Sequence, residues 1–185
     1  MFSSLADSSG DGQFFKAPLV DFGSLSIGTG FSICTWLRFD GIGSWSRVFD
    51  FGNGPGQGNI ILAQNGESST LSFVRWQVCN NINTYYGFNF PVGILYSQWR
   101  HVCVMNKGIR WTYYDNGALV GSDQTCGLTS DPLFSNYLGR SNWNPDRLFQ
   151  GGLAEFRIYS RSLSLAEVQA IYAYRGAYLE EEHRV

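Results

Sequence analysis

The segment Phe31–Phe39 constrains the fold more than any other stretch, because its side chains alternate with the period of a β-strand. Its odd-numbered positions are apolar or β-branched, and its even-numbered positions include Cys34 at the centre. A second segment of this kind, 99–105, also has a central cysteine, Cys103. We therefore begin from the hypothesis that these two strands lie side by side and are joined through Cys34 and Cys103.

Strand-like segments recur along the whole chain. Each is short, rich in aromatic and β-branched residues and bounded by turn residues, and Asn116-Gly117 is the strongest hairpin signal. The further segments are 47–51, 59–63, 70–78, 85–92, 109–115, 118–120, 137–139 and 151–159. Residues 14–27 are expected to be extended as well. The sequence thus predicts an all-β fold, a two-sheet antiparallel β-sandwich or jelly roll.

One short helix is expected near the C-terminus. Ser164 and Glu167 have the spacing of a capping box, and apolar residues at helical spacing follow them. Gly176 is the expected end of this helix. We expect a flexible N-terminus (1–13), one jelly-roll domain (14–176) and a charged tail (177–185).

Composition and charge exclude several classes of function. A net charge of -2 does not favour electrostatic capture of nucleic acid or of an anionic membrane. No run approaches the roughly 20 apolar residues of a membrane-spanning helix. Aromatic residues are 16% of the chain and charged residues 15%, a balance typical of a β-rich extracellular surface. Residues 1–13 lack the features of a signal peptide, so we expect Met1 to begin a mature form or an excised domain of an extracellular or cell-surface protein.

The four cysteines admit two interpretations. They are Cys34, Cys79, Cys103 and Cys126, none lies in a Cys-x-x-Cys pair, and the chain has two histidines, so a zinc site is not favoured. They are either buried free thiols of an intracellular protein or two disulfides formed in an oxidising compartment. Four cysteines can pair in three ways.

Three sets of segments together resemble a known family. They are 31–36 with 47–53, 99–104 with 113–117, and 138–141 with 149–159 and 163–168. In this order they resemble the laminin G-like jelly rolls of the concanavalin A-like superfamily, which include the pentraxins. The likeness covers roughly residues 14–174. It implies the same sandwich fold for this chain.

The resemblance also bears on the cysteines. Pentraxins join a cysteine in a Phe-x-x-Cys strand to a cysteine in a His-x-Cys strand. Phe31 with Cys34, and His101 with Cys103, match this pattern. The resemblance therefore implies a disulfide between Cys34 and Cys103, and the remaining pair would be Cys79–Cys126.

Calcium is the one candidate cofactor. Calcium binds oxygen ligands from Asp, Asn and backbone carbonyls, and in pentraxins an Asp-Asn pair before a strand supplies some of them. Here only Asn59 stands at the matching place, and the acidic loop is shortened to residues 141–146. The sequence allows a single ion held by Asp50, Asn53 and Asp146; the alternative is that these side chains make turn hydrogen bonds.

Catalytic machinery is not expected. Glycoside hydrolases need two carboxylates that flank the sugar bond, but the mid-chain glutamates are Glu67, in a turn, and Glu155, which has no carboxylate two positions away. His101 has no nucleophile in a motif context unless Cys103 is free. The sequence therefore does not predict an enzyme.

Recognition by surface loops is the function that we favour. Sugars stack on exposed aromatic faces, and Asn and Asp bond their hydroxyl groups. Trp143 is the strongest candidate, because its loop is polar and has no alternating pattern that would bury the ring. The predicted ligand-binding residues are Trp143, Asn142, Asn144, Asn59 and Trp45.

The sequence thus predicts a non-catalytic extracellular recognition or adhesion module. Its predicted partner is a glycan or an extracellular protein, bound through loops that the sandwich positions. The alternative is a self-assembling structural subunit of an extracellular fibre, coat or surface assembly.

Overall fold

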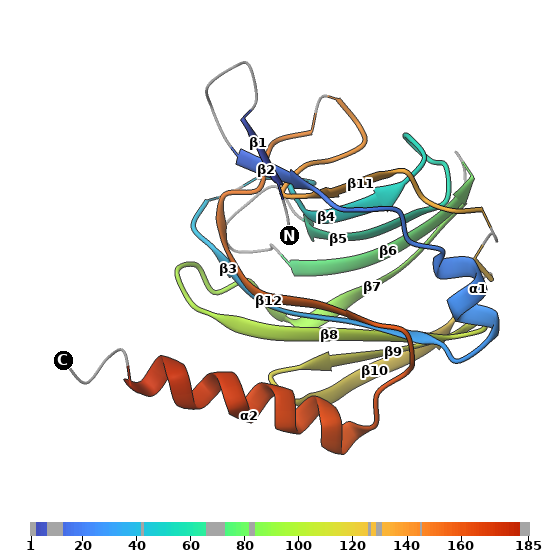
Figure 1. Cartoon of the computed structure of the whole chain (residues 1–185). Coiled ribbons are helices and arrows are strands. Elements are labelled where there is room, and N and C mark those ends of the chain that lie inside the picture. The colour runs from blue at the N-terminus through green and yellow to red at the C-terminus, as the bar shows by residue number, and fades with distance from the viewer. Residues whose placement is uncertain are drawn as a thin grey trace.

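The computed structural model describes residues 3–6, 13–41, 43–65, 73–81, 84–125, 127–128, 131–144 and 146–181 (Figure 1). The strands are β1 (Ser3–Ala6), β2 (Gln13–Lys16), β3 (Phe31–Phe39), β4 (Arg47–Gly52), β5 (Asn59–Asn65), β6 (Phe73–Asn81), β7 (Thr84–Gly93), β8 (Arg100–Lys107), β9 (Arg110–Asp115), β10 (Ala118–Gln124), β11 (Ser135–Leu138) and β12 (Gly151–Tyr159). The helices are α1 (Phe22–Ile27) and α2 (Leu165–Glu181).

Two antiparallel sheets face each other. The seven-stranded sheet has the order β1-β2-β11-β4-β5-β6-β7, and the five-stranded sheet has the order β10-β9-β8-β3-β12. Many neighbouring strands, such as β3 and β12 or β11 and β4, are distant in the sequence. The predicted all-β, two-sheet antiparallel sandwich with a C-terminal helix is confirmed.

Aromatic side chains from both sheets fill the space between them. Trp76 of β6 and Trp111 of β9 meet with ring centroids 5.0 Å apart, and Phe49 of β4 lies 5.8 Å from Trp76. All three are buried. Burying a side chain such as Phe49 is worth about 1.5–3 kcal/mol relative to leaving it in water, so this aromatic layer is a large part of what holds the sheets together.

The strands β3 and β8 are joined as the first hypothesis states. Cys34 lies directly opposite Cys103 in the antiparallel register, their Cα atoms are 4.1 Å apart, and a disulfide links them. The predicted disulfide is confirmed. Helix α2 lies along the outer side of the five-stranded sheet (Figure 1), and Val168 and Ile171 of α2 pack in the same apolar cluster as the two cysteines. The disulfide is therefore sealed between the sheet and the helix.

Three segments differ from the expectations. Residues 22–27 form α1 instead of an extended segment, because Asp21 accepts a hydrogen bond from the Ser24 N–H at 2.9 Å and caps the helix. Helix α2 continues beyond Gly176 to Glu181, since one interior glycine costs a helix only about 1 kcal/mol. Ser3–Ala6, inside the stretch expected to be flexible, pair with β2.

The second predicted disulfide lies outside what the structure describes. Cys126 is not among the described residues, and the side chain of Cys79, on β6, is not described. The pairing Cys79–Cys126 stays a prediction.

Candidate functional site

A hollow of about 230 Å³ opens on the outer face of the seven-stranded sheet. The alternation of β5 defines this face, because Ile60 and Leu62 enter the core between the sheets, whereas Ile61 and Ala63 belong to a separate outer cluster. Two tryptophans pack on that outer cluster. We call the site the aromatic hollow, and it is lined by Trp45, Arg47, Gln77, Tyr85, Trp143 and Asp146.

The lining comes from distant parts of the chain. Arg47 begins β4, Gln77 is on β6 and Tyr85 is on β7, so sheet pairing brings these three side chains to one face. Trp45 belongs to the turn before β4, and Trp143 and Asp146 belong to the segment after β11, where Trp143 packs against the sheet. Two of the ligand-binding residues that the sequence predicts, Trp45 and Trp143, therefore meet in one site.

Arg47 holds the two tryptophans in place. Its guanidinium carbon lies 5.2 Å from the ring centroid of Trp45 and 5.4 Å from that of Trp143. Its Nη2 forms an ion pair with Asp146 Oδ2 at 2.9 Å, and its Nη1 donates to the carbonyl oxygen of Trp45. Because the Arg47 side chain is 4% exposed, these contacts form in a site largely shielded from water. The guanidinium therefore fixes both indoles and balances the carboxylate beside them.

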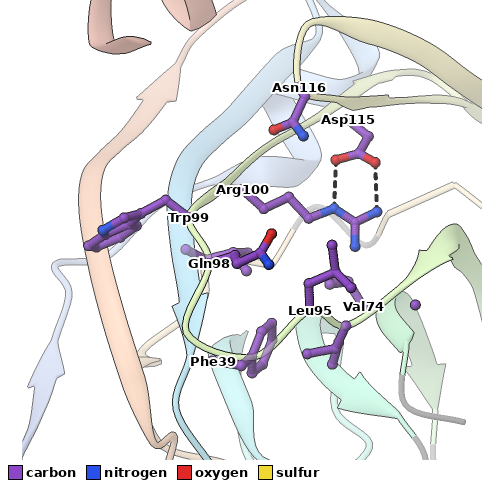
Figure 2. Close-up of a pocket in the computed structure, with 11 residues that line it drawn as sticks. Phe39, Val74, Leu95, Gln98, Trp99, Arg100, Asp115 and Asn116 are labelled. Atoms are coloured by element: carbon purple, nitrogen blue, oxygen red, sulfur yellow. Dashed lines mark hydrogen bonds and ion pairs between the residues drawn. The ribbon is translucent and has the colours of Figure 1, made fainter. Parts of the chain in front are cut away.

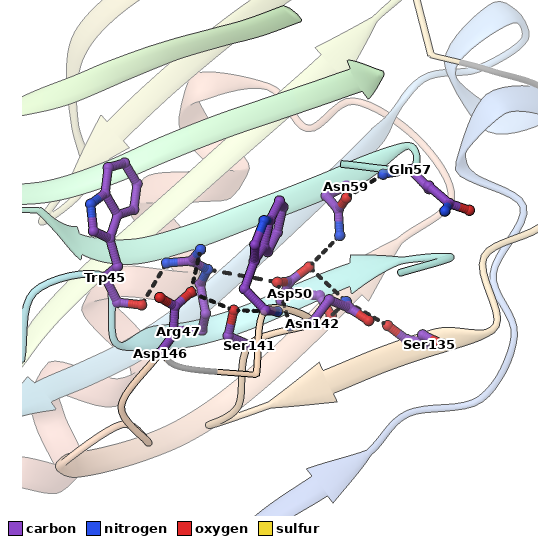
Figure 3. Close-up of polar contacts among 10 residues, drawn as sticks. Trp45, Arg47, Asp50, Gln57, Asn59, Ser135, Ser141, Asn142 and Asp146 are labelled. Atoms are coloured by element: carbon purple, nitrogen blue, oxygen red, sulfur yellow. Dashed lines mark hydrogen bonds and ion pairs between the residues drawn. The ribbon is translucent and has the colours of Figure 1, made fainter. Parts of the chain in front are cut away.

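A buried carboxylate anchors the loop that carries Trp143 (Figure 3). Asp50 on β4 is 0% exposed, and its Oδ2 accepts a hydrogen bond from the Asn142 backbone N–H at 2.9 Å. Its Oδ1 accepts from Asn142 Nδ2 and from Asn59 Nδ2, each at 2.8 Å. Arg47 Nε lies 3.6 Å from Oδ2. Burial raises the pKa of Asp50, and these hydrogen bonds and the arginine oppose that rise.

The rest of the loop is ordered by its own side chains. Ser141 Oγ donates to Asp146 Oδ2 at 2.7 Å and accepts from the Trp143 backbone N–H at 3.0 Å. Asn142 Nδ2 also donates to the Ser135 carbonyl oxygen at 3.0 Å (Figure 3). The backbone on both sides of Trp143 is thus tied down, which sets the direction of the indole.

The three predicted ligand-binding asparagines have different environments in the structure. Asn144 is exposed and follows Trp143 in the loop. Asn59 is 0% exposed, and its Oδ1 accepts from the Gln57 N–H at 2.8 Å. Asn59 and Asn142 do not line the aromatic hollow; both bond the carboxylate of Asp50 that anchors the Trp143 loop.

The predicted calcium ligands are already engaged with protein groups. Asn53 donates to the Pro132 carbonyl oxygen at 3.0 Å and accepts from the Phe134 N–H at 2.8 Å. Asp50 and Asp146 share Arg47, whose cationic group lies where a cation between them would lie. In the described part of the chain, no group of three or more His, Cys, Asp or Glu side chains could hold a metal ion. The calcium site stays a prediction.

Sequence reasoning did not find three members of the lining, Arg47, Gln77 and Tyr85. Gln77 and Tyr85 stand at outward-facing positions of strands with alternating side chains, and this alternation was the one sequence signal that could have identified them. That signal marks many outward residues, and only the pairing of β4, β5, β6 and β7 shows which of them share one face.

Comparison with known proteins gives a family and several structural neighbours. Residues 9–169 match the family profile Laminin_G_3, described as the concanavalin A-like lectin/glucanases superfamily. A curated relative, BEACH domain-containing protein B of Arabidopsis thaliana, is 28% identical over 182 residues; the match covers 83% of this chain and 7% of the relative. The chain therefore spans a small part of that relative's length.

Solved structures share the fold at low sequence identity. Domain 4 of AbnA, an extracellular arabinanase from Geobacillus stearothermophilus solved with arabinotriose, has a TM-score of 0.63 and 17% identity and covers 93% of this chain and 81% of that one. The SAP-like pentraxin of Limulus polyphemus has a TM-score of 0.60 and 15% identity, with 85% and 72% covered. Botulinum neurotoxin type C, whose cell entry depends on two ganglioside molecules, has a TM-score of 0.59 and 15% identity, with 88% and 39% covered.

No helix in the described ranges has the length and apolar character needed to cross a membrane.

Proposed function

Because the chain belongs to the concanavalin A-like lectin/glucanases superfamily, we propose that it is a non-catalytic extracellular recognition module that binds a glycan at the aromatic hollow. The observation that carries this proposal is the meeting of Trp45 and Trp143 over one outer face of the sheet, with polar side chains between them. Both tryptophans are candidates from the sequence alone.

The chemistry of the hollow supports a sugar ligand. Binding sites combine apolar and aromatic surface with a few polar groups at fixed positions, and sugar rings present one apolar face and a rim of hydroxyl groups. Here Trp45, Trp143 and the 47% exposed Tyr85 supply aromatic surface, and Gln77 and Asp146 supply planar polar groups. Because Asp146 is paired with Arg47, the lining has balanced charge and suits a neutral glycan.

The structural neighbours support the same class of ligand. Domain 4 of AbnA is solved with arabinotriose, and cell entry of botulinum neurotoxin type C depends on two ganglioside molecules. At 15–17% identity these proteins share the fold, so they guide the choice of glycans to test and supply no residue of the site.

The non-catalytic part of the proposal rests on the carboxylates. Of the residues that line the hollow, Asp146 is the one carboxylate, and it is held by Arg47 and Ser141. Glycosidases generally use two carboxyl groups, about 5–9.5 Å apart across the sugar bond. We therefore expect a bound glycan to be released intact. Chromatography of the glycan after prolonged incubation with the protein measures whether it has been cleaved.

A glycan array that includes arabino-oligosaccharides and sialylated glycans tests the proposal. Wild type is expected to bind a subset, and Trp143→Ala and Trp45→Ala are each expected to weaken binding by about tenfold or more, the effect of roughly 1.4 kcal/mol of lost stacking. Phe134→Ala is the matched control, because Phe134 is an aromatic residue that is 60% exposed and lies outside the hollow.

Thermal unfolding of each variant separates loss of binding from loss of folding. Equal binding by wild type and both tryptophan variants, with folding intact, would remove the glycan site from the hollow. A wild type that binds no glycan on the array would refute the proposal itself.

The extracellular part of the proposal rests on the disulfide. Cys34 and Cys103 are bonded and buried, and such bonds form and persist in oxidising compartments. Mass spectrometry of the protein from its native source, after alkylation without reductant, tests this: alkylated Cys34 and Cys103 would contradict it.

A structural role in an assembly has one observation in its favour. Strand β7 lies at an edge of the seven-stranded sheet and bears two exposed tyrosines, Tyr85 and Tyr86, at 47% and 38% exposure. An open strand edge can pair with another chain. Light scattering distinguishes the two functions, since concentration-dependent assembly without glycan binding would favour the structural role.

A further inference from the structure

A second cavity lies between the two sheets, away from the aromatic hollow. It has a volume of about 120 Å³. The five-stranded sheet contributes residues of β3, β8 and β9, and the seven-stranded sheet contributes residues of β6 and β7. We call it the inter-sheet pocket, and it is lined by Leu37, Phe39, Val74, Gly93, Ile94, Leu95, Gln98, Trp99, Arg100, Asp115 and Asn116 (Figure 2).

The floor of the inter-sheet pocket is apolar and rigidly placed. Leu37 and Phe39 of β3, Val74 of β6 and Ile94 are between 0% and 7% exposed, and all four belong to the main core. Such side chains are held by close packing on their other sides. The floor therefore offers preformed apolar surface and not a flexible patch.

The mouth of the pocket combines polar and apolar groups. Gln98 and Asn116 bring amide groups to the rim, and Asn116 is oriented because its Oδ1 accepts from the His101 N–H at 2.9 Å. Leu95 lies at the same rim and is 59% exposed. An entering molecule would thus pass an amide-bearing rim before it reaches hydrocarbon.

The charges beside the pocket neutralise each other. Arg100 Nε donates to Asp115 Oδ1 at 2.6 Å and Arg100 Nη2 donates to Asp115 Oδ2 at 2.7 Å, a bidentate pair (Figure 2). The two side chains are 11% and 8% exposed, and the Arg100 guanidinium lies 5.7 Å from the ring centroid of Phe90. Because both ions are matched and fixed, the pocket presents no net charge to a ligand.

We propose that the inter-sheet pocket binds a small neutral amphiphile. Its apolar end is one aromatic ring or a branched alkyl group of that size, and its polar end is an amide or hydroxyl that reaches the rim. The volume limits the apolar end to one small group, because the pocket's volume of about 120 Å³ lies just below that of an apolar cavity of about 150 Å³ that holds one benzene molecule. This site shares no lining residue with the aromatic hollow, so the proposal stands independently of glycan binding.

Titration of the ¹⁵N-labelled full chain with 2-phenylacetamide, followed by NMR, tests the proposal. Saturable shifts are expected at Leu95, Gln98 and Asn116 and not at Trp143. Leu95→Ala is expected to weaken binding about fivefold, the loss for one partly buried aliphatic contact. Leu119→Ala is the control, because Leu119 is 58% exposed and lies outside the pocket.

A matched ligand tests the charge argument. Phenylacetate has the same ring and nearly the same shape as 2-phenylacetamide but carries a negative charge, so it is expected to bind at least fivefold more weakly. Equal or tighter binding of phenylacetate would overturn the inference that the ligand is neutral. Absence of saturable shifts with 2-phenylacetamide, or shifts scattered outside the pocket, would overturn the site.

Discussion

Replacing Asp50 by alanine tests whether the buried polar network holds the loop of Trp143. Asp50 is fully buried on β4, and its carboxylate accepts hydrogen bonds from the backbone and side chain of Asn142 and from the side chain of Asn59. It also lies against Arg47. Asp50→Ala removes the acceptor and leaves every donor in place.

The magnitude follows from those donors. A buried donor that loses its acceptor costs about 1–3 kcal/mol, and several lose theirs at once. Part of this loss is offset, because the ionised carboxylate is itself unfavourable when buried, as the raised pKa of Asp50 shows. Removing one member of a buried ion pair typically costs about 3–5 kcal/mol. We therefore expect Asp50→Ala to lower the free energy of unfolding by about 3–5 kcal/mol.

Urea unfolding followed by far-UV circular dichroism measures this change. Asp40→Ala is the control, because Asp40 is a surface aspartate whose partner, Arg38, is equally accessible at 37% exposure; its midpoint is expected to stay close to that of wild type. A loss below about 1 kcal/mol for Asp50→Ala, with an unchanged denaturant slope, would show that the carboxylate does not hold the loop.

Three further predictions concern the disulfide, acid and calcium. The double variant Cys34→Ala/Cys103→Ala should lose about 4 kcal/mol of unfolding free energy in urea, the chain-entropy value for a sequence separation of 69; a loss within error of zero would contradict it. Burial lowers the pKa of His101 from 6.5 to about 4, with Asp115 raising it and Arg157 lowering it. Between pH 4 and pH 6.5 this histidine is therefore protonated in the unfolded chain but neutral in the folded protein, so the free energy of unfolding should fall by up to about 3 kcal/mol as pH drops from 6.5 to 4. A His101→Gln variant measured in parallel should lack this fall. Equal pH slopes for the two proteins would refute the prediction. The melting temperature should be unchanged by a calcium chelator, because an arginine already pairs with two of the predicted ligands; a chelator-dependent decrease would instead support the calcium site that the sequence predicts.

The fold was largely predictable because its signals are local. Alternation along Phe31–Phe39 and the Asn116-Gly117 turn each depend on a few consecutive residues. Helix α1 was not predicted, because its six residues are too few to show helical periodicity. What holds it is a cap from Asp21 and the packing of Phe22 against Phe31, with ring centroids 4.8 Å apart.

The candidate site was predictable only in part, because its contacts are non-local. Trp143 stands out in the sequence because no alternating pattern would bury it, and the structure places it in the aromatic hollow. The roles of Asn142 and Asn59 do not show in the sequence: both are predicted there to bind ligand, yet both bond Asp50, which is 92 positions from Asn142. A buried carboxylate beneath a loop becomes visible only when the strands are paired.

The buried network also bears on how a glycan would be bound. Fixing a free side chain on binding costs about 0.5–1.5 kcal/mol, and two indoles that moved freely would incur that cost twice. Here Arg47 lies against both rings, and Asp50 and Ser141 fix the backbone of the Trp143 loop. Asp50 does not line the hollow, so an effect of Asp50→Ala on glycan affinity acts through the groups that Asp50 contacts, which are the Trp143 loop and Arg47. We expect that variant, measured below its unfolding midpoint, to bind about tenfold more weakly; unchanged affinity would show that the network stabilises the fold without preparing the site.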